Sequence, residues 1–184
     1  MWSKALAASA IAAMVLLPTG CAHEEHKEAK SVDPSLTEEA ARQRIFGYLE
    51  KTADETGIGF SMSPDGDNHG SPFQPAGPMP CYDGYQEHGP HQVQVSYWVV
   101  GVPAGQTPQY FARLRQTWTG WGWKLDSEAT STLAGLGTPD NYTFVLQDAG
   151  KGDGWLSITA ASPCFPYSGM GSKTPQPTVI QRPS

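Results

Sequence analysis

The segment from Gln92 to Val102 constrains the fold more than any other part of the chain. It reads QVQVSYWVVGV, so polar and apolar residues alternate in its first half and its second half is a continuous apolar run. Alternation with a period of two is typical of a strand with one buried face, and an unbroken apolar run is typical of a strand deep inside a sheet. We therefore predict a central strand here.

Two segments with helical periodicity flank this strand. Over residues 36–52 apolar side chains follow the spacing of one helix face, and Ser35 or Thr37 can cap the start. The pair Thr107-Pro108 predicts the start of a second helix, with the threonine as cap and the proline at the first helical position. Gly120 is well placed to end that helix.

Strand patterns follow the second helix at residues 122–126, 141–147 and 155–160, and the last two predict a hairpin. Helix, strand, helix and three strands form an α+β pattern. We predict an antiparallel sheet of about four or five strands, with both helices packed on one face. The other face is expected to be partly open or covered by the long Gly/Pro-rich loop of residues 57–91.

Length and charge restrict the organisation of the chain and its partners. The 184 residues, 39% of them hydrophobic, suffice for one core, which we place in a globular domain at residues 35–166. Residues 167–184 lack periodicity and predict a disordered tail. A net charge of −6 argues against nucleic acid, because binding to phosphates depends on clustered Lys and Arg.

The N-terminal residues predict the compartment. The apolar stretch Ala5–Leu17 behind Lys4 is too short to span a bilayer and is typical of an export signal, so residues 1–20 are predicted to be a signal peptide. Thr19-Gly20-Cys21 matches a bacterial lipobox, in which cleavage precedes a cysteine whose sulfur carries diacylglycerol. Pro18 departs from the motif, because Leu is usual there. A soluble secreted protein and an uncleaved anchor are the alternatives.

Lipidation of Cys21 would hold the protein at the extracytoplasmic face of a cell membrane. Residues 21–34 are charged and have no apolar period, which predicts a flexible tether. An exported compartment also permits oxidation of the two remaining cysteines. We predict a disulfide between Cys81 and Cys164, with two free thiols as the alternative.

Metal and catalytic motifs are weak. Asp65, Asp67 and His69 resemble the start of a calcium loop, but Ala76 stands at the position of its bidentate glutamate. The pairs His23/His26 and His88/His91 have no third ligand nearby. No motif for acyl, phosphoryl or hydride transfer is present in the sequence, so we expect neither a cofactor nor enzymatic activity.

Aromatic residues are the remaining candidates for a binding site. Trp121 and Trp123 follow the second predicted helix and suit either core packing or a groove for an acyl chain or a glycan. We predict a module that binds an envelope lipid or protein partner. A lipid or glycolipid carrier is the first alternative, and a metal-dependent hydrolase built on Asp65, Asp67 and His69 is the second.

Several motifs together resemble the LppA-like lipoproteins of mycobacteria and related actinobacteria. These are the lipobox and the segments SLTEEAARQRIFGYLE, MPCYD, TPQYFARLRQTWTGWGWKLDSE and ITAASPCF, within about residues 17–166. The resemblance implies an envelope lipoprotein with a lipidated Cys21 and a Cys81/Cys164 pair. It implies no catalytic residue.

Overall fold

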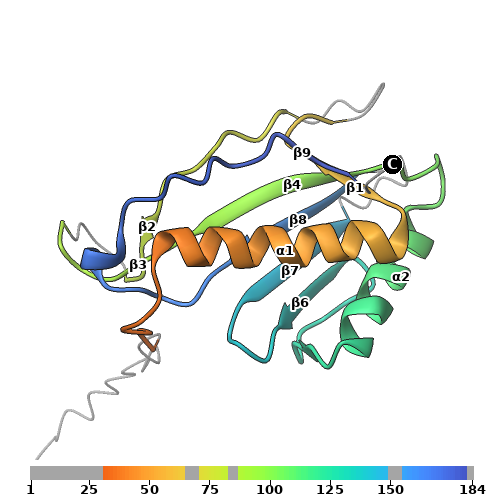
Figure 1. The fold of residues 1–184 in the computed structure, drawn as a ribbon. Coiled ribbons are helices and arrows are strands. Elements are labelled where there is room, and N and C mark those ends of the chain that lie inside the picture. The colour runs from red at the N-terminus through yellow and green to blue at the C-terminus, as the bar shows by residue number, and fades with distance from the viewer. Residues whose placement is uncertain (1–30, 65–70, 83–86, 149–154, 182–184) are drawn as a thin grey trace, which may run out of the picture.

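The computed structural model describes residues 31–64, 71–82, 87–148 and 155–181 (Figure 1). Cys21, Asp65, Asp67 and His69 therefore lie outside the described residues. The elements, in chain order, are α1 (Glu38–Thr56), β1 (Gly59–Ser61), β2 (Met79–Pro80), β3 (His91–Gln92), β4 (Gln94–Val100), α2 (Thr107–Gly120), β5 (Lys124–Leu125), β6 (Leu133–Gly137), β7 (Thr143–Asp148), β8 (Leu156–Ala161), η1 (Tyr167–Gly169) and β9 (Val179–Ile180).

The predicted α+β fold is confirmed. Seven strands form one sheet in the order β5-β6-β7-β8-β4-β1-β9, and every pairing in it is antiparallel. A second sheet pairs β2 with β3. Both helices lie on the same face of the large sheet (Figure 1). The predicted hairpin is confirmed by the pairing of β7 with β8. The sheet has more strands than expected because β6 lies between β5 and β7 and because the short strands β1 and β9 extend the opposite edge.

Alternation along the central strands puts one set of side chains into the core. In β4, Val95, Tyr97 and Val99 are buried while the residues between them are half-buried. The strands β7 and β8 follow the same rule, since successive side chains of a strand point to opposite faces. The buried side chains pack against α1 and α2, so the core occupies one side of the sheet.

Each helix is positioned by its apolar stripe. Ala41, Ile45 and Leu49 of α1 are fully buried, and Thr37 caps the helix by accepting a hydrogen bond from the Ala40 amide at 3.2 Å. The predicted start of α2 is wrong by one residue, because Gln106 is the N-cap and Thr107 is the first helical residue. The Thr107 side chain is buried, and its hydroxyl makes no capping hydrogen bond.

The C-terminal strap, residues 167–181, runs beside α1 and ends in β9 (Figure 1). The prediction of a disordered tail is therefore wrong for these residues, while residues 182–184 lie outside the described part. Sequence periodicity could not reveal the strap, because hydrogen bonds rather than an apolar stripe attach most of it. Its apolar contribution comes from Ile180, which is 5% exposed and pairs with Phe60.

Two glutamates at the start of α1 hold the strap. The Glu39 carboxylate accepts hydrogen bonds from the amides of Lys173 and Thr174 at 2.9 and 3.1 Å and from the hydroxyl of Ser172 at 2.6 Å. The hydroxyl of Thr174 also donates to it. Glu38 accepts from the Gly171 amide at 2.9 Å. Hydrogen bonds from the Ser172 and Thr174 hydroxyls lower the pKa of Glu39 from 4.5 to about 2.

The docking of the strap on α1 should therefore depend on pH. Because the pKa of Glu39 is lowered in the folded state, its contribution is present above pH 4.5 and is lost as the pH falls toward about 2. In Glu39→Gln we expect the Lys173 and Thr174 amides to exchange faster than in the wild type, and this part of the acid dependence to disappear. Amide hydrogen exchange read by NMR measures both effects.

Glu50→Gln is the matched control, because Glu50 lies exposed on the same helix. It should leave exchange in the strap unchanged. Equal protection of the strap amides in the wild type and in Glu39→Gln would contradict this role of Glu39.

Candidate functional site

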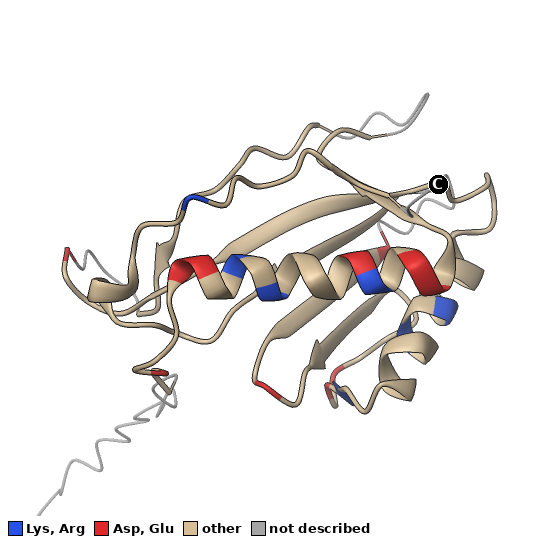
Figure 2. Ribbon diagram, viewed as in Figure 1, with Lys and Arg blue, Asp and Glu red and all other residues tan. Residues whose placement is uncertain are grey.

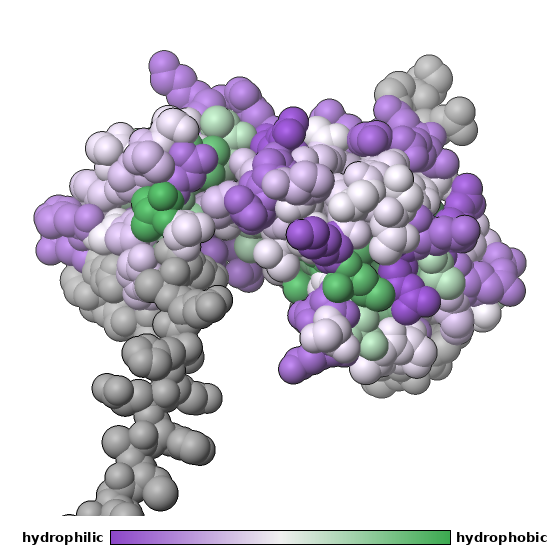
Figure 3. Space-filling view, turned by 90° about the horizontal axis from the view of Figure 1, so that it is seen from below, coloured by the Kyte–Doolittle hydropathy of each residue, from purple (hydrophilic) through white to green (hydrophobic). Residues whose placement is uncertain are grey.

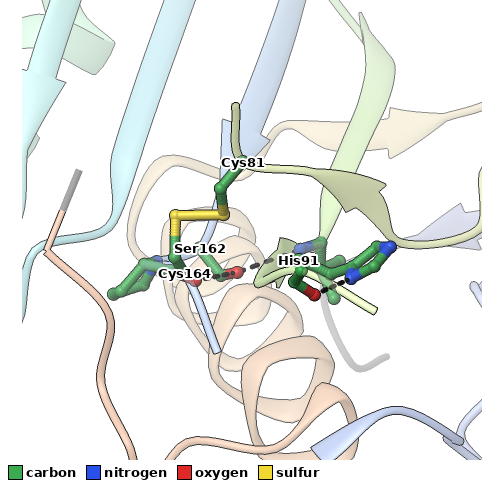
Figure 4. The surroundings of a disulfide bond; sticks show 7 residues. Cys81, His91, Ser162 and Cys164 are labelled. Carbon is green, nitrogen blue, oxygen red and sulfur yellow. Dashed lines mark hydrogen bonds between the residues drawn. A yellow bond between two sulfur atoms is a disulfide. The ribbon is translucent and has the colours of Figure 1, made fainter. Parts of the chain in front are cut away.

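The predicted disulfide between Cys81 and Cys164 is confirmed (Figure 4). The two Cα atoms are 6.1 Å apart, and the bond joins positions separated by 83 residues in the sequence. It connects the end of the long loop, just after β2, to the segment that follows β8. A cross-link over so many residues limits the freedom of the unfolded chain more than a local one does.

Polar contacts fix the chain around the disulfide (Figure 4). The Ser162 hydroxyl accepts a hydrogen bond from the Val93 amide at 3.0 Å and donates one to a backbone carbonyl. The His91 ring lies 2.8 Å from the Gly89 carbonyl oxygen. On the other side, Val32 forms a bridge to Cys164. Val32 and Asp33 of the predicted tether therefore contact the domain, since the Asp33 amide also donates to the Cys164 carbonyl at 2.8 Å.

Two cavities that share lining residues form the candidate site, which we call the polar groove, and the first of them lies beside the disulfide. Their volumes are about 430 and 510 Å³, and both are lined by Asn141 and Thr143. The first extends toward β4 and the disulfide, and its further lining residues are Ser31, Gln92, Gln94, Ala161, Ser162, Pro163 and Cys164. The second extends toward β5 and is also lined by Gly122, Lys124, Gly137, Thr138, Pro139 and Tyr142.

Eight of the fifteen described lining residues have a neutral side chain that can form hydrogen bonds. The side chains are amides, hydroxyls and small aliphatic groups, and Lys124 is the one charged residue among the described lining residues. The side chains of Gln94, Asn141 and Thr143 make no hydrogen bond to any other residue that the structure describes. Each amide can donate and accept at the same time, so Gln94 and Asn141 offer paired donors and acceptors that carry no charge.

The turn between β6 and β7 positions Asn141. This residue has a φ of 65°, a left-handed conformation that asparagine tolerates better than most residues. Its amide donates to the Thr138 carbonyl at 3.0 Å, which closes the turn. The same turn contains Asp140, whose carboxylate accepts hydrogen bonds of 2.7 Å from Arg44 and from Tyr48 on α1. Helix α1 therefore fixes the position of a groove residue.

The ionised carboxylate of Asp140 links the β6–β7 turn to helix α1. A third hydrogen bond of 2.7 Å comes from the Thr138 hydroxyl. Burial alone would raise the pKa of the Asp140 carboxyl, but the three hydrogen bonds outweigh it and the pKa is lowered. This contribution to the shape of the turn is present at neutral pH and is lost as the pH falls through the lowered pKa.

The structure places Trp121 and Trp123 in an aromatic cluster rather than in a cavity. Trp123 is 4% exposed, and its ring centroid lies 5.4 Å from that of Trp118 and 4.7 Å from that of Phe144. Trp121 closes the cluster on the outside, where the ammonium group of Lys51 lies 3.9 Å from the centroid of its ring. Neither tryptophan lines the two cavities of the polar groove.

Hydrophobic groups are scattered on the face seen from below. Figure 3 shows small hydrophobic patches separated by hydrophilic residues. A carrier for acyl chains needs a continuous apolar wall, because each methylene group that stays in water forfeits about 0.8 kcal/mol. The lining of the polar groove does not have that character.

The metal predictions have no structural counterpart in the described part of the chain. Asp65, Asp67 and His69 lie outside it, and the described residues contain no group of three or more His, Cys, Asp or Glu side chains that could hold an ion. His88 and His91 both lie against the ring of Tyr167, with centroid distances of 4.8 and 6.0 Å.

Comparison of the chain with family models, with curated proteins and with known solved structures gave no match. The interpretation of the site therefore depends on its own geometry.

Sequence reasoning missed the groove residues Gln94 and Asn141. The sequence shows only where these residues stand relative to the strands. Gln94 alternates with the core residues of β4, and Asn141 precedes β7. Neither signal specified that the two side chains would line one cavity.

Replacement of each tryptophan by alanine should show which of the two rings belongs to the core. Trp123→Ala should lower the free energy of unfolding by about 3–5 kcal/mol, because it empties a buried site. Trp121→Ala should lower it by about 1 kcal/mol or less, since its ring is only partly buried. Urea unfolding measures both, and similar small losses for both variants would contradict the assignment of Trp123 to the core.

Loss of the disulfide should weaken the fold without abolishing it. The double variant Cys81→Ser/Cys164→Ser should lower the free energy of unfolding by about 2–4 kcal/mol, because the unfolded chain gains freedom. Urea unfolding of the variant and of the oxidised wild type gives the difference. Thiol labelling of Cys81 in the native wild type without reductant would contradict the bond.

Proposed function

We propose that the chain is a lipid-anchored protein of the extracytoplasmic face of a cell membrane, whose folded domain binds a ligand in the polar groove. This proposal is supported by the position at which the N-terminal segment joins the domain, which is beside the groove. Ser31, the first described residue, lines the groove, and Val32 pairs with Cys164 beside it. The proposed anchor and the proposed binding site thus lie at the same end of the domain.

Chain length keeps the groove near the membrane. Ten residues lead from Cys21 to Ser31. A fully extended chain covers at most about 3.6 Å per residue, so the groove would stay within about 36 Å of the anchored sulfur. A binding site held at this distance would meet ligands at or just above the bilayer surface.

A further feature supports export. The Cys81–Cys164 bond is typical of an oxidising compartment outside the cytoplasm. Attachment through Cys21 would supply a membrane contact, because acyl chains contribute about 0.8 kcal/mol per buried methylene group. No helix among the described residues is long and apolar enough to cross a membrane.

The anchor is tested in cells of the source organism grown with an alkyne-tagged fatty acid. The wild-type protein should carry the tag and sediment with membranes, whereas Cys21→Ala should lose the tag and leave the membrane fraction. Cys81→Ala/Cys164→Ala is the matched control, since it removes two other cysteines and should keep the tag. A wild-type protein without the tag, or a Cys21→Ala variant that keeps it, would contradict the proposal.

A further inference from the structure

The sheet face opposite the helices is neutral over its central strands. Strand pairing places the residues of this uncovered face in three rows. The first row lies along the polar groove and contains Gln94, Ala161, Thr143 and Gly137. The second contains Ser96, Thr159, Val145 and Gly135, and the third contains Trp98, Ser157, Gln147 and Leu133.

None of these twelve positions is charged, although Lys, Arg, Asp and Glu make up 16% of the chain. Figure 2 shows where the charges lie instead, with most of them on α1 and at loops and strand ends. Two charged residues lie at the edge of these rows, Lys124, which pairs with Gly137, and Asp126, whose side chain lies beside Gly135. A charged ligand bound over the twelve central positions would lose hydration without an opposite charge beneath it, which is unfavourable. The face therefore suits a ligand without net charge.

The hydrogen-bonding groups of the face suit a ligand rich in hydroxyls. A hydroxyl group donates one hydrogen bond and accepts others, and the amides of Gln94 and Asn141 can satisfy both roles. These amides are not engaged by other described residues. In the second row, Ser96 and Thr159 lie with their hydroxyl oxygens 2.9 Å apart, which leaves unused acceptor capacity on both.

An aromatic corner completes the face. The Trp98 ring lies between Phe73 and Trp155, with centroid distances of 5.0 and 6.0 Å, and its indole nitrogen donates to the Ser71 carbonyl. Trp98 is four residues from Gln94 on one strand, so the corner is about 13 Å from the groove. Sugar rings combine C–H faces, which pack on aromatic rings, with hydroxyls, which bind amides.

We infer that the polar groove and the uncovered face bind a neutral glycan, with its hydroxyls on Gln94 and Asn141 and its chain directed toward Trp98. This inference rests on the proposed function and specifies the ligand class of the same groove. A protein partner would also accept a face depleted of charge, but protein interfaces gain most from large apolar anchors. The centre of this face carries small residues instead.

Binding is tested on the mature chain, residues 21–184, carrying Cys21→Ser. Maltohexaose, a mannan hexasaccharide and a galactan hexasaccharide are the neutral probes, and a sulfated heparin hexasaccharide is the charged control. Titration calorimetry gives the affinity, and backbone amide NMR shifts give the site. We expect at least one neutral probe to bind, with the largest shifts at the first row, and no binding of the heparin probe.

Three variants give the test its specificity. Asn141→Gly removes the amide but keeps a residue that accepts a positive φ, and Gly137→Val fills the groove at a position where an added Cβ meets nothing within 4 Å. Each should lower the affinity about tenfold, Asn141→Gly through the loss of one or two hydrogen bonds and Gly137→Val through steric exclusion of the ligand. Gln116→Glu, on the exposed surface of α2, should leave it unchanged.

Other results would overturn the inference. Failure of every neutral probe to bind, shifts on the helix side, or unchanged affinity in both groove variants would exclude a glycan site here. Crosslinks from the uncovered face to an envelope protein in cells, together with no glycan binding, would replace the ligand class with a protein. In each case the fatty-acid label at Cys21 still decides the anchored location separately.

Discussion

The structure depends on the burial of one face of the β4-β8-β7 sheet. Alternate residues such as Tyr97, Phe144 and Ile158 are buried, and together with both helices they form the core. Burial of one such side chain contributes about 1.5–3 kcal/mol to the free energy of folding, so the packing of these residues holds both helices on this side of the sheet. Neither α1 nor α2 therefore covers the opposite face, where the Trp98 ring packs against two other aromatic rings, those of Phe73 and Trp155.

Residues of helix α1, on the covered side, also fix the position of a turn that lines the groove on the uncovered side. Arg44 and Tyr48 reach from α1 to Asp140, and Asp140 lies in the turn that presents Asn141 to the groove. Tyr48 in addition packs edge-on against Trp123 in the aromatic cluster. The tryptophans that the sequence proposes as ligand contacts thus act on the groove indirectly, by supporting the helix that fixes its turn.

The sequence predicted those parts of the fold that have strong local patterns. The segment from Gln92 to Val102 alternates clearly, and its residues Gln94–Val100 form the interior strand β4, while Gln92 belongs to β3 of the small sheet. The Thr107-Pro108 pair predicts a helix whose start is wrong by only one residue. Strand β6 was missed because its sequence LAGLG contains two glycines, which are poor strand formers, and its partner strand determines its conformation. The strap was missed because its attachment to Glu39 joins residues more than 130 positions apart.

The candidate site was less predictable than the fold for a related reason. Gln94, Asn141 and Ser162 are separated widely in the sequence, and only the register of three strands brings them to one groove. Single neutral polar residues also have no motif that would distinguish them from ordinary surface positions. The candidates that do have recognisable types, Trp121 and Trp123, are used for packing.

The central claim is that the uncovered face carries a ligand in the envelope. Hydroxyl-radical footprinting of the anchored protein in intact cells tests it, with the purified protein as the reference. Trp98 and Trp121 are both half-buried but lie on opposite sides of the domain, so they form an internal comparison. We expect Trp98 to be oxidised several-fold more slowly in cells than in the purified protein, and Trp121 to be oxidised equally in both. Equal oxidation of Trp98 in cells and in the purified protein would contradict it.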